Sequence, residues 1–181
     1  GKNDAFAVLP SWSEEFIGVK AFTYFPEASE PYQSLYSKIM LFDREHGVPL
    51  ALVDGTTVTY WRTAGISGLA TRLLSREDSG TMLLLGTGNL APYMIRANAS
   101  VRDLKKIIIW GRTQAKAQAL AVEMSKEYPD IDFVATQDRE AACGEADIIV
   151  CATASHEPVV LGDWVKPGTH TDFIGNHHAT K

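Results

Sequence analysis

A glycine-rich turn between a strand and a helix constrains this chain most. The apolar run Met82 to Leu85 ends in Gly86-Thr-Gly-Asn-Leu-Ala91, and a helical pattern begins directly afterwards. In this G-x-G-x-x-A spacing the glycines permit a tight turn and a close backbone approach to a ligand, and the last small residue lets the helix pack on the strand. Free N–H groups and the dipole at a helix start favour an anion. The stretch predicts a dinucleotide site in which the pyrophosphate binds Gly86, Thr87, Gly88, Asn89 and Leu90; a purely steric turn is the alternative.

The sequence around this turn alternates short apolar strands with helical stretches. Strands are expected at Met82–Leu85, Ile107–Trp110, Phe133–Ala135, Ile148–Ala152 and Thr171–Ile174, and helices at Pro92–Val101 and Gln114–Lys126. Strands that are apolar on both faces and separated by helices are typical of a parallel, doubly wound sheet. Residues 76–181 are therefore predicted to form an α/β Rossmann domain.

The preceding part of the chain has a different pattern. Strands are expected at Phe16–Phe25, Ser34–Phe42 and Pro49–Asp54, followed by a small-residue helix at Thr63–Leu74. A His46-Gly47 turn between the last two strands favours antiparallel pairing. The polar run SREDSG, Ser75 to Gly80, then separates the two patterns. We therefore expect residues 1–75 to form part of a second, mixed and largely antiparallel domain.

The end of the second strand of the Rossmann half indicates which dinucleotide binds. NAD-specific folds commonly have an acid there, about 20 residues after the glycines, that binds the ribose hydroxyls. This chain instead has Arg112, Thr113 and Lys116. Guanidinium, hydroxyl and ammonium donors suit a 2′-phosphate, so NADPH is predicted over NADH. The alternative is that the two cations are solvated and that Thr113 caps the next helix.

A second loop of small residues follows the strand Ile148–Ala152. Ligands of open α/β sheets bind at the carboxyl ends of the strands. Ala152, Thr153 and Ala154 are therefore predicted to contact the cofactor, although a plain small-residue turn fits the same sequence.

Composition excludes several other classes of function. The net charge is −5 and the basic residues are scattered, which disfavours a nucleic-acid partner. No apolar run reaches the roughly 18 to 20 residues of a membrane span, and the first residues do not resemble a signal peptide, so a cytoplasmic protein is expected. Cys143 and Cys151 are expected to be buried thiols. The spacing of the histidines does not predict a metal site.

Several segments together resemble one family over essentially the whole chain. The segments are GVKAFTYFP, LFDREHGVPLALVDGTTVTYWRTAGISGLA, GTGNLA, WGRTQAKA, ADIIVCATAS and WVKPGTHTDFIG. They resemble the ornithine cyclodeaminase and mu-crystallin family. The resemblance implies a homodimer built from a substrate-binding and dimerisation domain and a Rossmann domain. It also implies that this chain is part of a longer protein, because family members extend further at both ends.

The resemblance assigns roles to two cations of the first half. Lys20, in the GVK segment, and Arg62, in the RTA segment, match the family's binders of the substrate carboxylate. Both lie in largely apolar stretches, which suits a bound carboxylate, although each taken singly is more often a surface residue with a packed stem. Arg62 is expected near the start of the small-residue helix.

One departure from the family pattern concerns the reaction. Ornithine cyclodeaminases carry Gly-Gly-Asp where this chain has Gly175-Asn176-His177. The missing carboxylate disfavours cyclodeamination. The NLAP, WGRT and THTDFIG segments look more like the branch that reduces Δ1-pyrroline-2-carboxylate, or its six-membered homologue, to proline or pipecolate.

The expected activity is thus NAD(P)H-dependent reduction of a cyclic imino acid, a small-molecule substrate whose ring size stays open. A protonated imine beside a carboxylate is a good hydride acceptor once it is held in place. His177 is a candidate proton donor, with solvent as the alternative source. The alternatives in other classes are a lyase that converts ornithine to proline and ammonia, and an NADPH-binding carrier of the mu-crystallin type.

Overall fold

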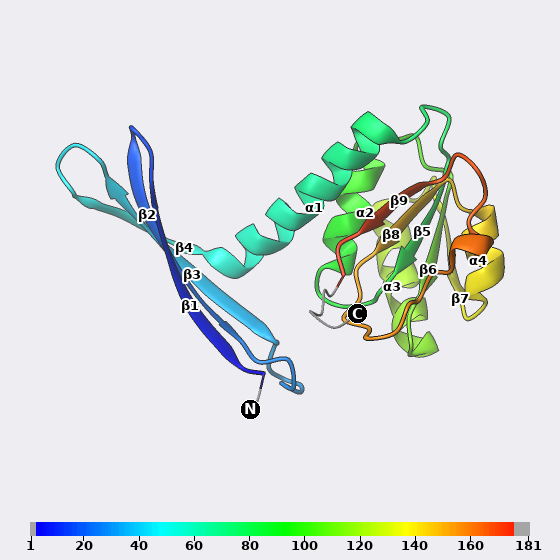
Figure 1. Ribbon diagram of the computed structural model, residues 1–181, viewed down its shortest axis with the longest axis horizontal. Helices are drawn as coiled ribbons and strands as arrows, with labels where there is room; N and C mark the ends of the chain where they lie inside the picture. Colours follow the sequence, from blue (N-terminus) through cyan, green and yellow to red (C-terminus); the bar gives the residue numbers. More distant parts are fainter. Residues whose placement is uncertain (1–2, 176–181) are drawn as a thin grey trace. The chain divides into compact units, whose positions relative to one another are not determined.

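The computed structural model describes residues 3–175. The chain divides into two compact units, residues 1–61 and 62–181 (Figure 1). We call the described parts the N-terminal unit, residues 3–61, and the C-terminal unit, residues 62–175. The division falls within helix α1, Gly55–Leu74, whereas the sequence places a domain boundary at the polar run that follows this helix.

The N-terminal unit contains an antiparallel sheet with the strand order β1-β2-β3-β4. The strands are β1 (Ala5–Trp12), β2 (Phe16–Tyr24), β3 (Leu35–Asp43) and β4 (Pro49–Asp54). The three expected strands and their antiparallel pairing are confirmed. Strand β1 was not expected, because Pro10 interrupts its pattern; the proline is tolerated because β1 pairs with β2 alone, at the edge of the sheet.

Helix α1 begins at Gly55, well before the expected Thr63. The carboxylate of Asp54 accepts hydrogen bonds from the backbone N–H of Thr56 at 3.2 Å and from the hydroxyl of Thr57 at 2.6 Å. An acid that binds the first free N–H groups starts a helix, even where threonine and valine follow and lower its propensity. Arg62 therefore lies in the interior of α1, and the expectation that it lies at a helix start was wrong.

The C-terminal unit is built on a parallel sheet with the strand order β7-β6-β5-β8-β9. Its elements, in chain order after α1, are β5 (Thr81–Leu85), α2 (Ala91–Ala99), β6 (Lys106–Trp110), α3 (Gln114–Glu127), β7 (Asp132–Thr136), α4 (Arg139–Glu145), β8 (Ile148–Cys151), the short 3₁₀ helix η1 (Gly162–Trp164) and β9 (His170–Phe173). The predicted Rossmann-type sheet is confirmed. Helix α4 was not expected, since its seven residues are too few to show a periodic pattern.

The core of this unit lies on both faces of the sheet. Met82 and Leu84 face one layer, which includes residues of α2 and α3, and Leu83 and Leu85 face the other, which includes residues of α4. Such two-sided burial explains the unbroken apolar runs in the sequence. Cys143 and Cys151 are free and buried in the second layer, as expected.

Strand β5 holds the central position of this sheet. The chain leaves it toward β6 on one side and reaches β8 on the other side. In open α/β sheets such a reversal of strand order leaves a crevice at the carboxyl ends of the central strands. Among the helices of residues 3–175, none is long and apolar enough to cross a membrane.

Candidate dinucleotide-binding site

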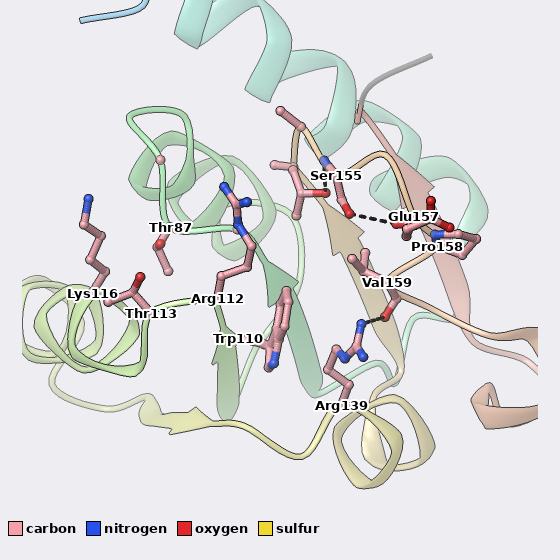
Figure 2. A pocket seen from close by; sticks show the side chains of 16 residues that line it. Thr87, Trp110, Arg112, Thr113, Lys116, Arg139, Ser155, Glu157, Pro158 and Val159 are labelled. Carbon is pink, nitrogen blue, oxygen red and sulfur yellow. Dashed lines mark hydrogen bonds between the residues drawn. The ribbon is translucent and has the colours of Figure 1, made fainter. Parts of the chain in front are cut away.

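A pocket of about 660 Å³ lies at the carboxyl ends of β5, β6 and β8 (Figure 2). Three loops that the sequence singles out separately meet in its wall. They contribute Gly86, Thr87, Gly88, Arg112, Thr113, Lys116, Ala152, Thr153 and Ala154. Asn89 and Leu90 continue the first loop into α2 without lining the pocket. The folded chain thus brings together most of the expected cofactor-binding residues.

Gly86 has the most restricted environment of these residues. Its backbone has a φ of +126°, which residues with a side chain rarely adopt, and a Cβ at this position would lie 2.3 Å from the carbonyl oxygen of Ala152. The Gly86 N–H donates to Trp110 O at 2.9 Å, and the Ala152 N–H donates to Leu85 O at 2.8 Å. The loop is therefore held against both neighbouring strands, and only glycine fits.

Gly88 lies in the opposite situation, since a Cβ there would meet no atom within 4 Å. Its carbonyl accepts from the Ala91 N–H at 2.9 Å, which closes the turn before α2. Within residues 3–175, the backbone N–H groups of Thr87, Gly88 and Leu90 donate no hydrogen bond. These donors and the open space above Gly88 fit the pyrophosphate of a dinucleotide.

The cationic side of the pocket follows β6. Thr113 occupies the N-cap position of α3, but its hydroxyl makes no capping hydrogen bond, which leaves the hydroxyl available to a ligand. Arg112 is exposed, and no acid of the described residues forms an ion pair with it. A Cβ on Gly111 would lie 2.7 Å from Cγ2 of Thr87, so this loop packs tightly against the glycine loop. The donor set fits a phosphate on the adenosine ribose.

The loop after β8 closes the other side. The Thr153 hydroxyl accepts from the Ser155 N–H at 3.3 Å, and the Ser155 hydroxyl donates to Glu157 O at 2.8 Å. Ser155 ends the small-residue loop that the sequence singles out, and the pocket residues that sequence reasoning missed are Trp110, Gly111, Arg139, Glu157, Pro158 and Val159. The small-residue run after β8 pointed to this loop, but nothing in the sequence pattern showed that Arg139 of α4 reaches it.

The predicted substrate-binding residues lie elsewhere in the chain. Lys20 is half-buried on β2; its Nζ donates to Oγ1 of Thr59 at 2.5 Å and lies 5.9 Å from the centre of the Phe22 ring. Arg62 is exposed on α1. His177 lies outside the described residues.

Two thiols lie in the core layer that also contains Trp110 of the pocket wall. Burial raises the pKa of Cys151, which lies at the end of β8, and also that of Cys143 in α4. A raised pKa keeps a thiol protonated and unreactive. In the part of the chain described here, no group of histidine, cysteine and acidic residues has the arrangement of a metal site.

Comparison with known proteins places the chain in a family. The family model of the ornithine cyclodeaminase/mu-crystallin family matches residues 1–181. A Δ1-pyrroline-2-carboxylate reductase of Colwellia psychrerythraea is 52% identical over 177 residues, which cover 97% of this chain and 56% of the relative.

Two solved structures are also similar. The Δ1-pyrroline-2-carboxylate reductase of Thermococcus litoralis, in complex with NADH and L-proline, has a TM-score of 0.88 and 34% identity over 96% of this chain and 54% of its own. An archaeal alanine dehydrogenase dimer with bound NAD has a TM-score of 0.84 and 26% identity over 94% of this chain and 52% of its own. The chain spans about half the length of these relatives. It belongs to the ornithine cyclodeaminase/mu-crystallin family.

Proposed function

We propose that the protein reduces a cyclic imino acid, Δ1-pyrroline-2-carboxylate or Δ1-piperideine-2-carboxylate, to L-proline or L-pipecolate with NAD(P)H. The observation that carries the proposal is the pocket built on Gly86 and Gly88, with open backbone donors for a pyrophosphate and no acid at the end of β6. The reductases from Colwellia and Thermococcus support the same reaction.

NADPH is the proposed cofactor, with NADH as the alternative. Arg112, Thr113 and Lys116 provide a guanidinium, a hydroxyl and an ammonium group on the wall of the pocket that follows β6. A 2′-phosphate would gain charge-assisted hydrogen bonds there, whereas a free ribose would meet no carboxylate. The nicotinamide would supply the hydride.

Lys20 and Arg62 are the proposed ligands of the substrate carboxylate. Half-burial of Lys20 strengthens its attraction for an anion, because water screens a half-buried charge less than an exposed one. Arg62 adds a planar fork of donors that suits a carboxylate. Held at its carboxylate, the imino acid would present its C=N bond in one orientation. His177 is the proposed proton donor at the imine nitrogen, with solvent as the other source.

The assembly and location of the protein are part of the same proposal. A cytoplasmic homodimer, in which residues 1–75 belong to a substrate-binding and dimerisation domain and 76–181 to the cofactor domain, fits the family. The archaeal alanine dehydrogenase with bound NAD is described as a dimer.

The deciding experiment follows NADPH absorbance in the intact protein with five-membered and six-membered imino acids. Net oxidation of NADPH that depends on the imino acid supports the proposal. Ammonia release from ornithine without net oxidation would identify a lyase instead. Tight NADPH binding without either reaction would identify a carrier.

A further inference from the structure

Arg139, the first residue of α4, lies in an environment that its own helix does not explain. A cation at the start of a helix faces the positive end of the dipole, so the position costs stability instead of adding to it. The side chain is half-buried, and within residues 3–175 it forms no ion pair. A half-buried guanidinium without an acid is costly unless something else binds it.

Two aromatic rings and one carbonyl hold this guanidinium in place. Its Cζ lies 5.0 Å from the centre of the Trp110 ring and 5.6 Å from that of Trp164. Its Nη1 donates to Val159 O at 3.5 Å, a long hydrogen bond (Figure 2). Cation–π contacts of this kind fix the position of the group without using its N–H donors. Most of the five N–H donors of Arg139 are therefore still available to a ligand.

The same guanidinium lines the dinucleotide pocket away from the phosphate-binding groups. In Figure 2, Arg112 and Lys116 lie on one side of the pocket and Arg139 lies near Val159 on the other. The wall around Arg139 also contains Trp110 and Pro158. An aromatic ring, a proline and a guanidinium with free donors together suit a purine, whose ring nitrogens accept hydrogen bonds and whose faces stack.

We propose that Arg139, held between Trp110 and Trp164, binds the adenine base of the cofactor and determines the preference for that base. This inference rests on the proposed cofactor-dependent function and adds a residue to its binding site. It gives the two arginines of the pocket separate roles. Arg112 binds the 2′-phosphate and distinguishes NADPH from NADH, whereas Arg139 binds the part that both cofactors share.

The test is calorimetric binding of NADPH, NADH and the analogue of NADH in which cytosine replaces adenine. For Arg139→Met in the intact protein, the affinities for NADPH and NADH should fall by the same factor, about 10-fold. The preference of the unmodified protein for adenine over cytosine should shrink by a similar factor. Arg72→Met, which changes an exposed arginine of α1 outside the pocket, is the matched control and should change no affinity.

Two results would overturn the proposal. A loss confined to NADPH would place Arg139 at the 2′-phosphate. An unchanged ratio between the adenine and cytosine dinucleotides would reduce Arg139 to a structural link between α4, β6 and η1. If Arg139→Met melts at a much lower temperature, Arg139→Lys replaces it, because it retains the charge but not the planar guanidinium. An unchanged ratio between the affinities for the adenine and cytosine dinucleotides in that variant would also overturn the proposal. Since binding is measured without an imino acid, failure of the imine reduction would leave this result intact.

Discussion

Charged side chains at the two ends of the parallel sheet differ in whether they form ion pairs within the chain. At the carboxyl ends of the strands, Arg112 and Arg139 line the pocket and have no acidic partner among residues 3–175. At the amino ends, Asp147 forms ion pairs with Arg76 at 3.1 Å and with Lys166 at 2.9 Å.

Asp147 also accepts hydrogen bonds from the backbone N–H groups of Gly80 and Thr81, both at 3.0 Å. The carboxylate thus joins the start of β5, the start of β8 and the segment before β9. Charges that are neutralised within the chain stabilise the fold, whereas charges left without a partner are available to a ligand. The comparison predicts that mutations at the two ends have different consequences.

The largest effect is expected for Gly86→Ala, at the carboxyl end. The new methyl group would collide with the carbonyl of Ala152, and the backbone would be held at a strained φ. The loop must move, at a cost of about 3 kcal/mol or more, and the dinucleotide should no longer bind. Thermal unfolding and cofactor titration measure both losses.

Gly88→Ala is the matched control for that change. The methyl group would meet no protein atom within 4 Å, so the melting temperature should stay unchanged while NADPH binding weakens. Equal melting temperatures for the two variants would contradict the distinction between a glycine required by the fold and one required by the ligand.

Arg62→Ala tests whether the pocket at the carboxyl ends of the strands binds the cofactor but not the substrate carboxylate. If Arg62 binds the substrate carboxylate, kcat/KM should fall by roughly 30- to 1000-fold, corresponding to about 2 to 4 kcal/mol. NADPH affinity should stay nearly constant, because Arg62 does not line the dinucleotide pocket. Steady-state kinetics and cofactor titration separate the two quantities.

Arg62→Lys should rescue little, because a flexible ammonium group cannot reproduce a planar fork. Near-normal efficiency of the alanine variant, in a protein that circular dichroism shows to be folded, would remove Arg62 from the substrate site.

Arg112→Asp should reverse the cofactor preference. A carboxylate at this position would repel the 2′-phosphate and accept hydrogen bonds from the ribose hydroxyls, so NADPH affinity should fall by roughly 10- to 100-fold and NADH should become the better ligand. Titration with NADPH and with NADH measures the ratio of the two affinities. Equal affinities for the two cofactors in the unmodified protein would show that Arg112, Thr113 and Lys116 do not bind a 2′-phosphate.

The smallest effect is expected at the amino end, where Asp147→Asn should lower stability by about 2 kcal/mol at neutral pH without weakening NADPH binding. Burial alone would raise the pKa of Asp147. The hydrogen bond from Lys166 and those from the N–H groups of Thr81 and Gly80 outweigh burial and lower the pKa to about 2.

Because the pKa of Asp147 is lowered in the folded state, its contribution to stability decreases as the pH falls. The contribution of Asp147 is present above the unfolded pKa near 3.8 and is lost as the pH falls from about 4 toward 2. The difference in melting temperature between the unmodified protein and the variant should therefore shrink over this range. A constant difference between pH 7 and pH 2 would show that the charge of Asp147 does not stabilise the fold.

The sequence predicted the carboxyl end of the sheet better than any other region. Two-sided burial produces unbroken apolar runs, and the glycine loop has a fixed spacing relative to β5 and α2, so both can be recognised locally. The loops after β6 and β8 were also found, because parallel strands bring their carboxyl ends together.

The missed features depend on contacts between distant residues. Strand β1 has exposed side chains and contains Pro10, and it becomes a strand only by pairing with β2. Arg139 reaches the pocket because α4 packs beside Trp110, which no local pattern reveals. The ion pairs of Asp147 likewise join segments far apart in the chain.

The tryptophan beneath Arg139 gives the pocket an optical property. The chain has 4 tryptophans, and Trp110 is 9% exposed, whereas Trp12 is 71% exposed. A small quencher in solution would suppress the emission of Trp12 and leave that of Trp110. Because a reduced nicotinamide absorbs light at the wavelengths at which tryptophan emits, a dinucleotide bound in this pocket would dim the remaining signal by energy transfer. Cofactor occupancy could then be followed in real time through the protein's own fluorescence, without an attached dye.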